Sequence, residues 1–189
     1  MRRRTILSVL VSATLGSGAG CVGRLGPAVG RDGRGNAEDD CPSFDDDADR
    51  TVCEPTGEHP ALVPERDVLR VDSGDDAVET LRIALRNEAD AEFSFGPHGW
   101  TLHRHDGEAG RWRRVERGST ALLLSVLDPG ATFEYSLAPS PHPTPNDDVH
   151  SAVASLSPGV HAFTVSGNIG EGDDATWVEC VARFRVERA

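Results

Sequence analysis

The sequence contains no lysine, since all 19 basic residues are arginine. It therefore cannot contain a phosphate-binding loop that uses lysine, a Schiff-base lysine or a Ser-x-x-Lys nucleophile. Gly-x-Ser-x-Gly and His-Glu-x-x-His are also absent, which excludes the usual serine-hydrolase elbow and zinc-protease helix. A blue-copper site usually needs a histidine and a methionine soon after its cysteine, and nothing after Cys180 fits, because Met1 is the single methionine.

The chain is poor in positive charge, with 31 acidic residues and a net charge of −12. Residues 1–20 hold three arginines and no acid, so the chain from Cys21 onward carries 16 basic and 31 acidic residues, a net charge of −15. Such a surface repels nucleic-acid phosphates, and no nucleic-acid partner is expected. Near 1 M salt the screening length falls to about 3 Å, so the composition favours a halophilic source. An arginine-rich codon bias in a GC-rich genome is the alternative.

Long hydrophobic runs are also lacking near the start, where the apolar stretch has about ten residues against the roughly 20 needed to span a bilayer. Arg2-Arg3-Arg4 precedes this stretch, and the small residues Gly18-Ala19-Gly20 follow it. Basic, apolar and small-residue regions in this order predict that residues 1–20 are a signal peptide. Arg3-Arg4-Thr5-Ile6-Leu7 resembles the twin-arginine pattern, which predicts Tat export.

Gly18-Ala19-Gly20-Cys21 resembles a lipobox, with Gly18 where leucine is usual. We therefore expect Cys21 to carry a membrane lipid that holds the protein at the extracellular face of the cell membrane. One lipid chain gives only marginal anchoring, so a stable tether implies two chains. The alternative is an ordinary cleaved signal peptide that happens to end near a cysteine.

Residues 21–64 are rich in Gly, Pro, Asp and Arg and follow no apolar period, which predicts a flexible linker. Besides Cys21, three cysteines remain, an odd number for an oxidising compartment. Cys41–Cys53 is the favoured disulfide because it closes a short loop. Cys180 is then either a buried free thiol or the residue that pins the linker to the domain.

Residues 65–188 show apolar residues at alternate positions in several short runs, which predicts strands with one buried face. The runs include Leu81, Ile83 and Leu85, then Phe133, Tyr135 and Leu137, and finally Val178, Cys180, Ala182, Phe184 and Val186. Turn residues such as Asp128-Pro129-Gly130 and Ser157-Pro158-Gly159 separate them. We expect an all-β fold, an antiparallel β-sandwich of about seven to eight strands.

Several motifs in this region occur in a familiar order: Leu85-Arg86-Asn87, Gly99-Trp100-Thr101-Leu102, Arg111-Trp112-Arg113, Leu127-Asp128-Pro129-Gly130 and Leu156-Ser157-Pro158-Gly159. In this order they resemble the immunoglobulin-like domains of prokaryotic surface lipoproteins, and the acidic, lysine-free composition is similar to the haloarchaeal ones. The resemblance covers most of residues 65–188 and implies a fold. It supplies no catalytic residues, and fold does not imply function.

His103 and His105 are the best site candidates, because alternate residues of a strand project to the same face. If both face solvent, they could bind Zn²⁺ or Cu²⁺ with a further ligand among His98, His142 and His150. Trp177 and the Pro-rich loop at residues 138–148 are further candidate contact points. The sequence thus predicts a non-enzymatic, cofactor-free display domain that binds a protein or a cell-envelope component. Metal binding through His103 and His105 is the alternative function.

Overall fold

The computed structural model describes residues 41–71, 79–119, 123–142 and 149–188. All the described residues belong to one compact unit. The predicted signal peptide, the proposed lipid site Cys21 and residues 22–40 lie outside the described residues. No helix within the described ranges is long and apolar enough to cross a membrane.

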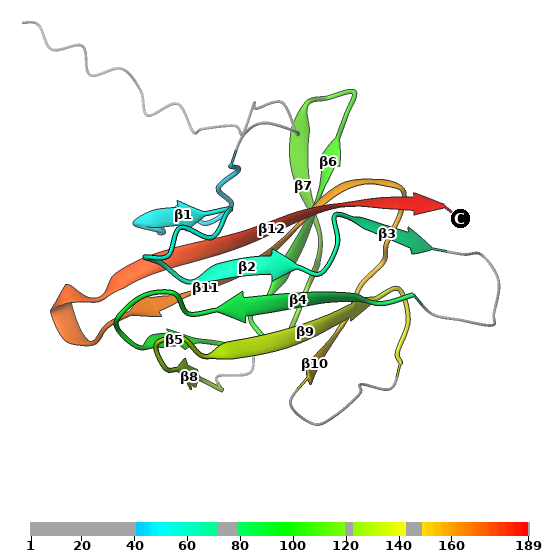
Figure 1. The fold of residues 1–189 in the computed structure, drawn as a ribbon. Helices are drawn as coiled ribbons and strands as arrows, with labels where there is room; N and C mark the ends of the chain where they lie inside the picture. The colour runs from blue at the N-terminus through cyan, green and yellow to red at the C-terminus, as the bar shows by residue number, and fades with distance from the viewer. Residues whose placement is uncertain (1–40, 72–78, 120–122, 143–148, 189) are drawn as a thin grey trace, which may run out of the picture. The chain divides into compact units, whose positions relative to one another are not determined.

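The described residues form twelve strands and one 3-10 turn. The strands are β1 (Arg50–Val52), β2 (Ala61–Pro64), β3 (Val68–Val71), β4 (Leu81–Arg86), β5 (Phe93–Phe95), β6 (Thr101–Asp106), β7 (Arg111–Arg117), β8 (Ser125–Leu127), β9 (Thr132–Ala138), β10 (Val149–Val153), β11 (Gly159–Ile169) and β12 (Thr176–Arg188), and the turn is Gly172–Asp174. They build an all-β sandwich of two packed sheets, as the alternation predicts (Figure 1).

The larger sheet is built on the long antiparallel pair β11–β12. On the outer side of β12 lie β1 and, further along the same strand, β3. On the outer side of β11 lie β5, which continues to β8, and β6, which continues to β7. The smaller sheet has the order β10-β9-β4-β2. In Figure 1 the β6–β7 hairpin extends beyond the two long strands.

The core lies between the sheets and consists of the residues that the alternation places inward. Leu81, Ile83 and Leu85 of β4 are fully buried while Arg82 and Arg86 are exposed. Most other residues of the predicted runs are buried as well, namely Tyr135, Leu137, Val178, Cys180, Ala182, Phe184 and Val186, and so are Leu69 of β3 and Phe93 and Phe95 of β5. Phe133 is only partly buried and packs at the margin of this core. Burial of these side chains provides the main driving force for the fold.

The domain begins earlier than residue 65, and the prediction of a flexible linker over residues 21–64 is wrong for residues 41–64. These residues supply β1 to the larger sheet and β2 to the smaller one. Ala61 and Leu62 are buried, and Cys41 forms a disulfide with Cys53. The segment is ordered despite its polar composition, because the disulfide and hydrogen bonds hold it in addition to apolar burial.

Two further details of the sandwich differ from the prediction. The described residues form more strands than the expected seven or eight, partly because β1 and β2 fall in the predicted linker. The sheets are also not wholly antiparallel, since β1 and β3 pair with β12, and β10 pairs with β9, in parallel. Parallel partners need a crossover rather than a tight hairpin, and turn residues alone do not reveal one.

Asn87 fixes the turns at one end of the sandwich. Its buried side-chain amide donates to the carbonyls of Ala91 and Leu127, both at 2.8 Å, and its carbonyl accepts from the backbone of Ala89. Its backbone is hydrogen-bonded to the turn containing Gly130. Gly130 has φ 76°, close to the roughly +80° that a type II turn requires at this position. The amide of Asn87 therefore joins the end of β4 to the end of β8.

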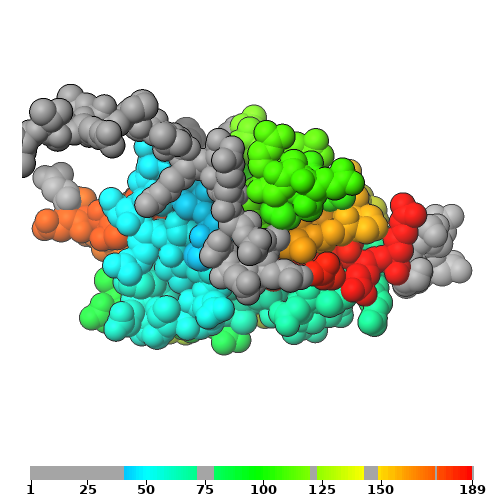
Figure 2. Space-filling view, turned by 90° about the horizontal axis from the view of Figure 1, so that it is seen from above, coloured from blue at the N-terminus to red at the C-terminus, as the bar shows by residue number. Residues whose placement is uncertain are grey.

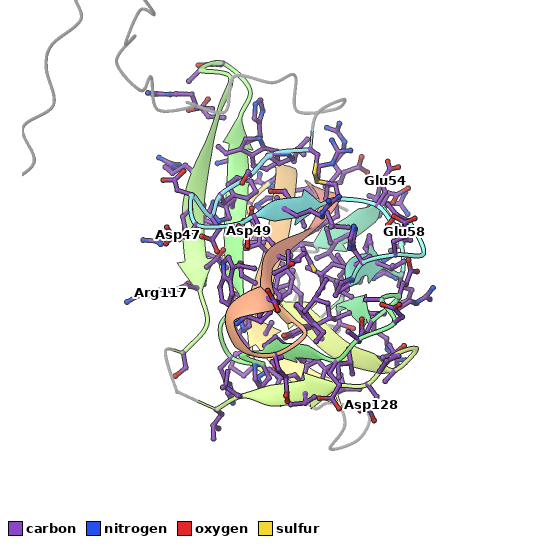
Figure 3. The ribbon with its side chains drawn as sticks, turned by 90° about the vertical axis from the view of Figure 1, so that its left-hand side faces the viewer. Asp47, Asp49, Glu54, Glu58, Arg117 and Asp128 are labelled. Atoms are coloured by element: carbon purple, nitrogen blue, oxygen red, sulfur yellow. A yellow bond between two sulfur atoms is a disulfide. The ribbon has the colours of Figure 1, made fainter. Side chains whose placement is uncertain are left out.

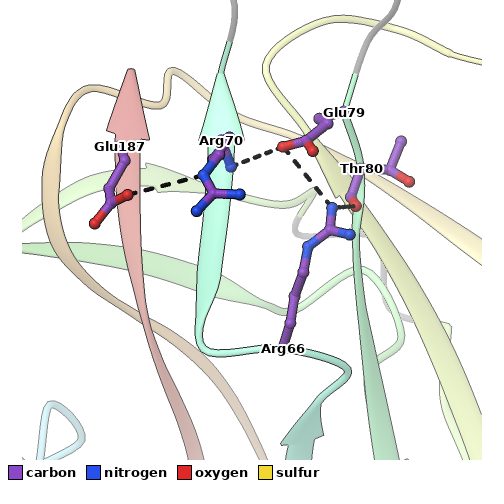
Figure 4. A network of polar contacts seen from close by, with 5 residues as sticks. All are labelled: Arg66, Arg70, Glu79, Thr80 and Glu187. Carbon is purple, nitrogen blue, oxygen red and sulfur yellow. Dashed lines mark hydrogen bonds and ion pairs between the residues drawn. The ribbon is translucent and has the colours of Figure 1, made fainter. Parts of the chain in front are cut away.

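A polar network borders β3 (Figure 4). Arg66 donates to the carbonyl of Thr80 at 2.7 Å and lies 3.9 Å from the carboxylate of Glu79. That carboxylate also accepts from the backbone of Arg70, whose side chain lies 4.0 Å from Glu187. Exposed ion pairs of this length contribute less than about 1 kcal/mol each, so the network aligns β3 with β12 more than it stabilises the fold.

Candidate functional site: the β6–β7 hairpin and its surroundings

The β6–β7 hairpin is fixed to the sheet on one side only. β6 pairs with β11 and with β7, whereas β7 pairs with β6 alone among the described residues. The turn between them closes through the backbone of Gly110, which donates to Asp106 at 2.7 Å with φ 61°. A hydrogen bond from the backbone of Ala109 lowers the pKa of the Asp106 carboxyl. In the part of the chain that the structure describes, no strand pairs with the outer edge of β7, which is seven residues long.

Positive charge gathers on this hairpin although the chain as a whole is acidic. Residues 101–117 contain three acids and five arginines, namely Arg104, Arg111, Arg113, Arg114 and Arg117. Four of these lie on β7, and all four are exposed. Figure 3 shows the side chain of Arg117 pointing away from the ribbon. The hairpin is therefore a cationic edge on a molecule whose net charge is −12.

Arg104 and Arg113 stand opposite each other in the register of the hairpin. Together with His105, Asp106, Gly107 and Glu108 they line a depression of about 360 Å³. Arg104 also donates to the carbonyl of Pro158 at 3.0 Å. This hydrogen bond restrains the side chain of Arg104, while Arg113 remains exposed.

An aromatic cluster covers the opposite face of the hairpin. The ring of Phe44 stacks on His103 with centroids 3.8 Å apart and meets Trp112 edge-on at 5.5 Å. Trp112 in turn contacts His105 at 5.2 Å. In Figure 2 the blue-to-cyan atoms of residues 41–64 lie on the same face as the green atoms of the hairpin. The segment predicted to be a linker therefore packs on the residues predicted to bind metal.

The prediction that His103 and His105 face solvent as a metal pair is wrong for His103. A β-bulge falls between Leu102 and His103, and His103 is only 8% exposed. Its Nε2 lies 2.9 Å from the hydroxyl of Thr101, so this nitrogen is already occupied. Burial, with a smaller effect from Arg114, lowers the pKa of His103 to about 4. His103 is a packing residue in this structure.

A buried carboxylate holds the disulfide loop on the outer face of β12. Glu179 is 1% exposed and accepts hydrogen bonds from the hydroxyl of Ser43 at 3.1 Å and the backbone of Phe44 at 3.0 Å. Burial raises its pKa, and these hydrogen bonds partly oppose the rise. Trp177 donates its indole N–H to Asp45 at 2.8 Å, so Trp177 binds the loop instead of forming an exposed platform.

The cysteines follow the favoured pairing. Cys41 and Cys53 form the disulfide, with Cα atoms 5.6 Å apart. Cys180 is a buried free thiol that donates to the carbonyl of Pro60 at 3.2 Å, and burial raises its pKa. Cys180 therefore contacts the segment that was predicted to be a linker through a hydrogen bond rather than a disulfide.

Other histidines meet elsewhere. Nδ1 of His98, in the loop after β5, lies 2.9 Å from Nε2 of His150 on β10. His142 instead contacts the hydroxyl of Ser136 through its Nε2, at 2.8 Å. No group of three or more His, Cys, Asp or Glu side chains suited to a metal occurs within the described ranges. The His98–His150 pair was not predicted, because 52 residues separate its members.

Comparison with known proteins adds little to this geometry. No family model matches the chain, and no curated protein matches it. One solved structure with a partial likeness is the X-ray structure of Northeast Structural Genomics Consortium target SoR45, with 10% sequence identity and a TM-score of 0.35. The likeness covers 67% of this chain and 83% of that one.

Proposed function

We propose that the protein is a cell-surface lipoprotein whose non-catalytic, immunoglobulin-like sandwich binds an extended acidic segment of a partner protein along β7. A lipid on Cys21 would hold it at the extracellular face of the cell membrane, after export through the twin-arginine route of a halophilic cell. The observation that carries the binding role is the arginine-bearing edge of β7, with which no other described strand pairs, on an otherwise acidic chain.

An exposed strand edge can accept an additional strand, with backbone hydrogen bonds giving affinity and alternate side chains giving specificity. Arg113 lies opposite Arg104 and Arg114 lies opposite His103, so successive arginines of β7 point to opposite faces of the hairpin. A strand with acidic side chains on both faces would meet a positive charge on either side. Screening at high salt weakens the charge contribution but leaves the backbone hydrogen bonds.

The binding test uses a fluorescent twelve-residue peptide of three Val-Val-Glu-Glu repeats, which places glutamates on both faces of the strand, titrated against the purified chain by anisotropy. Arg113→Glu/Arg114→Glu should weaken binding at least tenfold. The matched control is Arg82→Glu/Arg86→Glu, which reverses two exposed charges on β4 and should bind within twofold of the wild type. Equal losses of affinity in both variants would show a nonspecific charge effect. If the wild type did not bind the peptide, β7 would be only a charged edge strand that resists pairing with other copies. Either result contradicts the proposal.

The tether is tested separately, by mass spectrometry of the mature protein isolated from membranes. A mass increase on Cys21 that corresponds to a two-chain lipid is expected, and Cys21→Ser should release the protein into the medium. An unmodified thiol on a membrane-bound mature protein would refute the lipid anchor.

A further inference from the structure

The two half-buried histidines His98 and His150 connect the two sheets at one rim of the sandwich. His150 lies on β10, the edge strand of the smaller sheet, and stands in register with Tyr135, whose ring faces the core. His98 lies in the loop between β5 and β6 of the larger sheet. Their rings meet at 75°, with centroids 4.2 Å apart and the two facing nitrogens 2.9 Å apart.

We propose that His98 and His150 form a binding site for a divalent transition metal of the Cu²⁺ or Ni²⁺ class. Imidazole nitrogens lie about 2.0–2.1 Å from such ions. Two of them at adjacent corners of a square-planar or octahedral site subtend about 90° and are then about 2.9 Å apart, a separation equal to that of Nδ1 and Nε2 here. A tetrahedral angle requires about 3.4 Å, so Zn²⁺ would need the rings to move apart.

The surroundings favour both binding and a fixed geometry. The ring of His150 packs against Phe133 and Tyr135, with centroids 6.0 Å and 5.9 Å away, so its orientation is restricted before any ion arrives. Both histidines remain partly exposed, so an ion can enter and water can complete its coordination.

This pair differs from the predicted pair on β6 because its two ring nitrogens face each other. His103 and His105 belong to one strand, and the Nε2 of His103 already contacts Thr101. His98 and His150 come from the two sheets, and the nitrogens that face each other would both become ligands. An ion there would link the larger sheet to the edge strand of the smaller one, so binding should stabilise the fold by mass action.

The test titrates untagged protein with CuCl₂ and separately with NiCl₂, by calorimetry, and records the electron paramagnetic resonance spectrum of the copper complex. We expect one ion per chain and hyperfine structure from two imidazole nitrogens. His98→Gln and His150→Gln should each weaken copper binding at least tenfold and abolish the copper-induced rise in Tm. His142→Gln is the matched control and should bind as the wild type does.

Two results would overturn the site. One is wild-type protein that binds neither ion, which would leave the 2.9 Å contact as a hydrogen bond between neutral rings. The other is copper binding that both substitutions leave unchanged, which would place the ion elsewhere. Two separate variants guard against misfolding of either one, as checked by circular dichroism. The residues do not overlap those of β7, so failure here leaves the peptide-binding proposal standing, and the converse also holds.

Discussion

Acidification should destabilise the domain through His103, and the size of this effect can be calculated. The pKa of His103 is about 4 in the folded chain against 6.5 for an ordinary histidine. Between these two pKa values, His103 is neutral in the folded state and protonated in the unfolded chain. The stability contribution is complete above pH 6.5 and is lost as the pH falls from 6.5 towards 4. At about 1.36 kcal/mol per pH unit, the loss is about 2 kcal/mol at pH 5 and about 3 kcal/mol at pH 4.

The experiment compares the wild type with His103→Gln, which cannot titrate but can still hydrogen-bond to Thr101. Urea unfolding, followed by tryptophan fluorescence at constant salt, gives the free energy of unfolding at pH 7, 5 and 4. The variant will be less stable at pH 7 because it loses the stacking contact with Phe44. The gap between the two proteins should then shrink by about 2 kcal/mol at pH 5 and about 3 kcal/mol at pH 4.

Other groups titrate over the same range but are common to both proteins. The pKa of Glu179 is raised, so its protonation on acidification relieves a burial cost and acts in the opposite direction. This contribution cancels in the comparison. Leu102→Val is the packing control, since it should lower the free energy of unfolding by a similar amount at every pH. A gap between wild type and His103→Gln that stays constant within about 0.5 kcal/mol from pH 7 to pH 4 would refute the reasoning.

Three further predictions concern stability and reactivity. Gly167→Ala should lower the free energy of unfolding in urea by about 1–3 kcal/mol, because a Cβ there would clash with the carbonyl oxygen of Ser94; an unchanged midpoint would contradict this close approach. Cys41→Ser/Cys53→Ser should lower the free energy of unfolding by about 3 kcal/mol, as loop-closure entropy suggests for this spacing, and a loss below about 1 kcal/mol would show that the loop is held by other contacts. Cys180 should react with a thiol reagent only after denaturation, as peptide mass spectrometry can show, and rapid labelling of the folded chain would contradict its burial.

The sequence predicts the core well because period-two burial is a local property of a strand. Alternation predicts that Leu81, Ile83 and Leu85 face the core, and all three are buried. The residues that it places inward along β12 are buried as well. The Cys41–Cys53 pairing is also a local inference, since a short loop favours closure. The Pro-Gly turn at Gly130 has the positive φ that its chemistry requires.

The candidate sites could not be predicted to the same extent, because they depend on contacts between distant segments. The alternation places His103 outside, but the bulge beside Leu102 and the ring of Phe44 bury it. The ordering of residues 41–64 could not be predicted from their polar composition, because the carboxylate that accepts their hydrogen bonds belongs to Glu179, near the other end of the chain. His98 and His150 likewise lack any common motif, and the packing of the two sheets brings them together.

The Cys41–Cys53 disulfide has a mechanical consequence if the chain is pulled from its N-terminal side, as the proposed tether would do. Tension arriving at Cys41 crosses to Cys53 through the sulfur–sulfur bond and continues towards β2. The intervening residues, which include Phe44 and β1, carry none of this load. Their contacts with Glu179 and His103 are thereby insulated from a pull on the chain before Cys41, for as long as the bond remains oxidised.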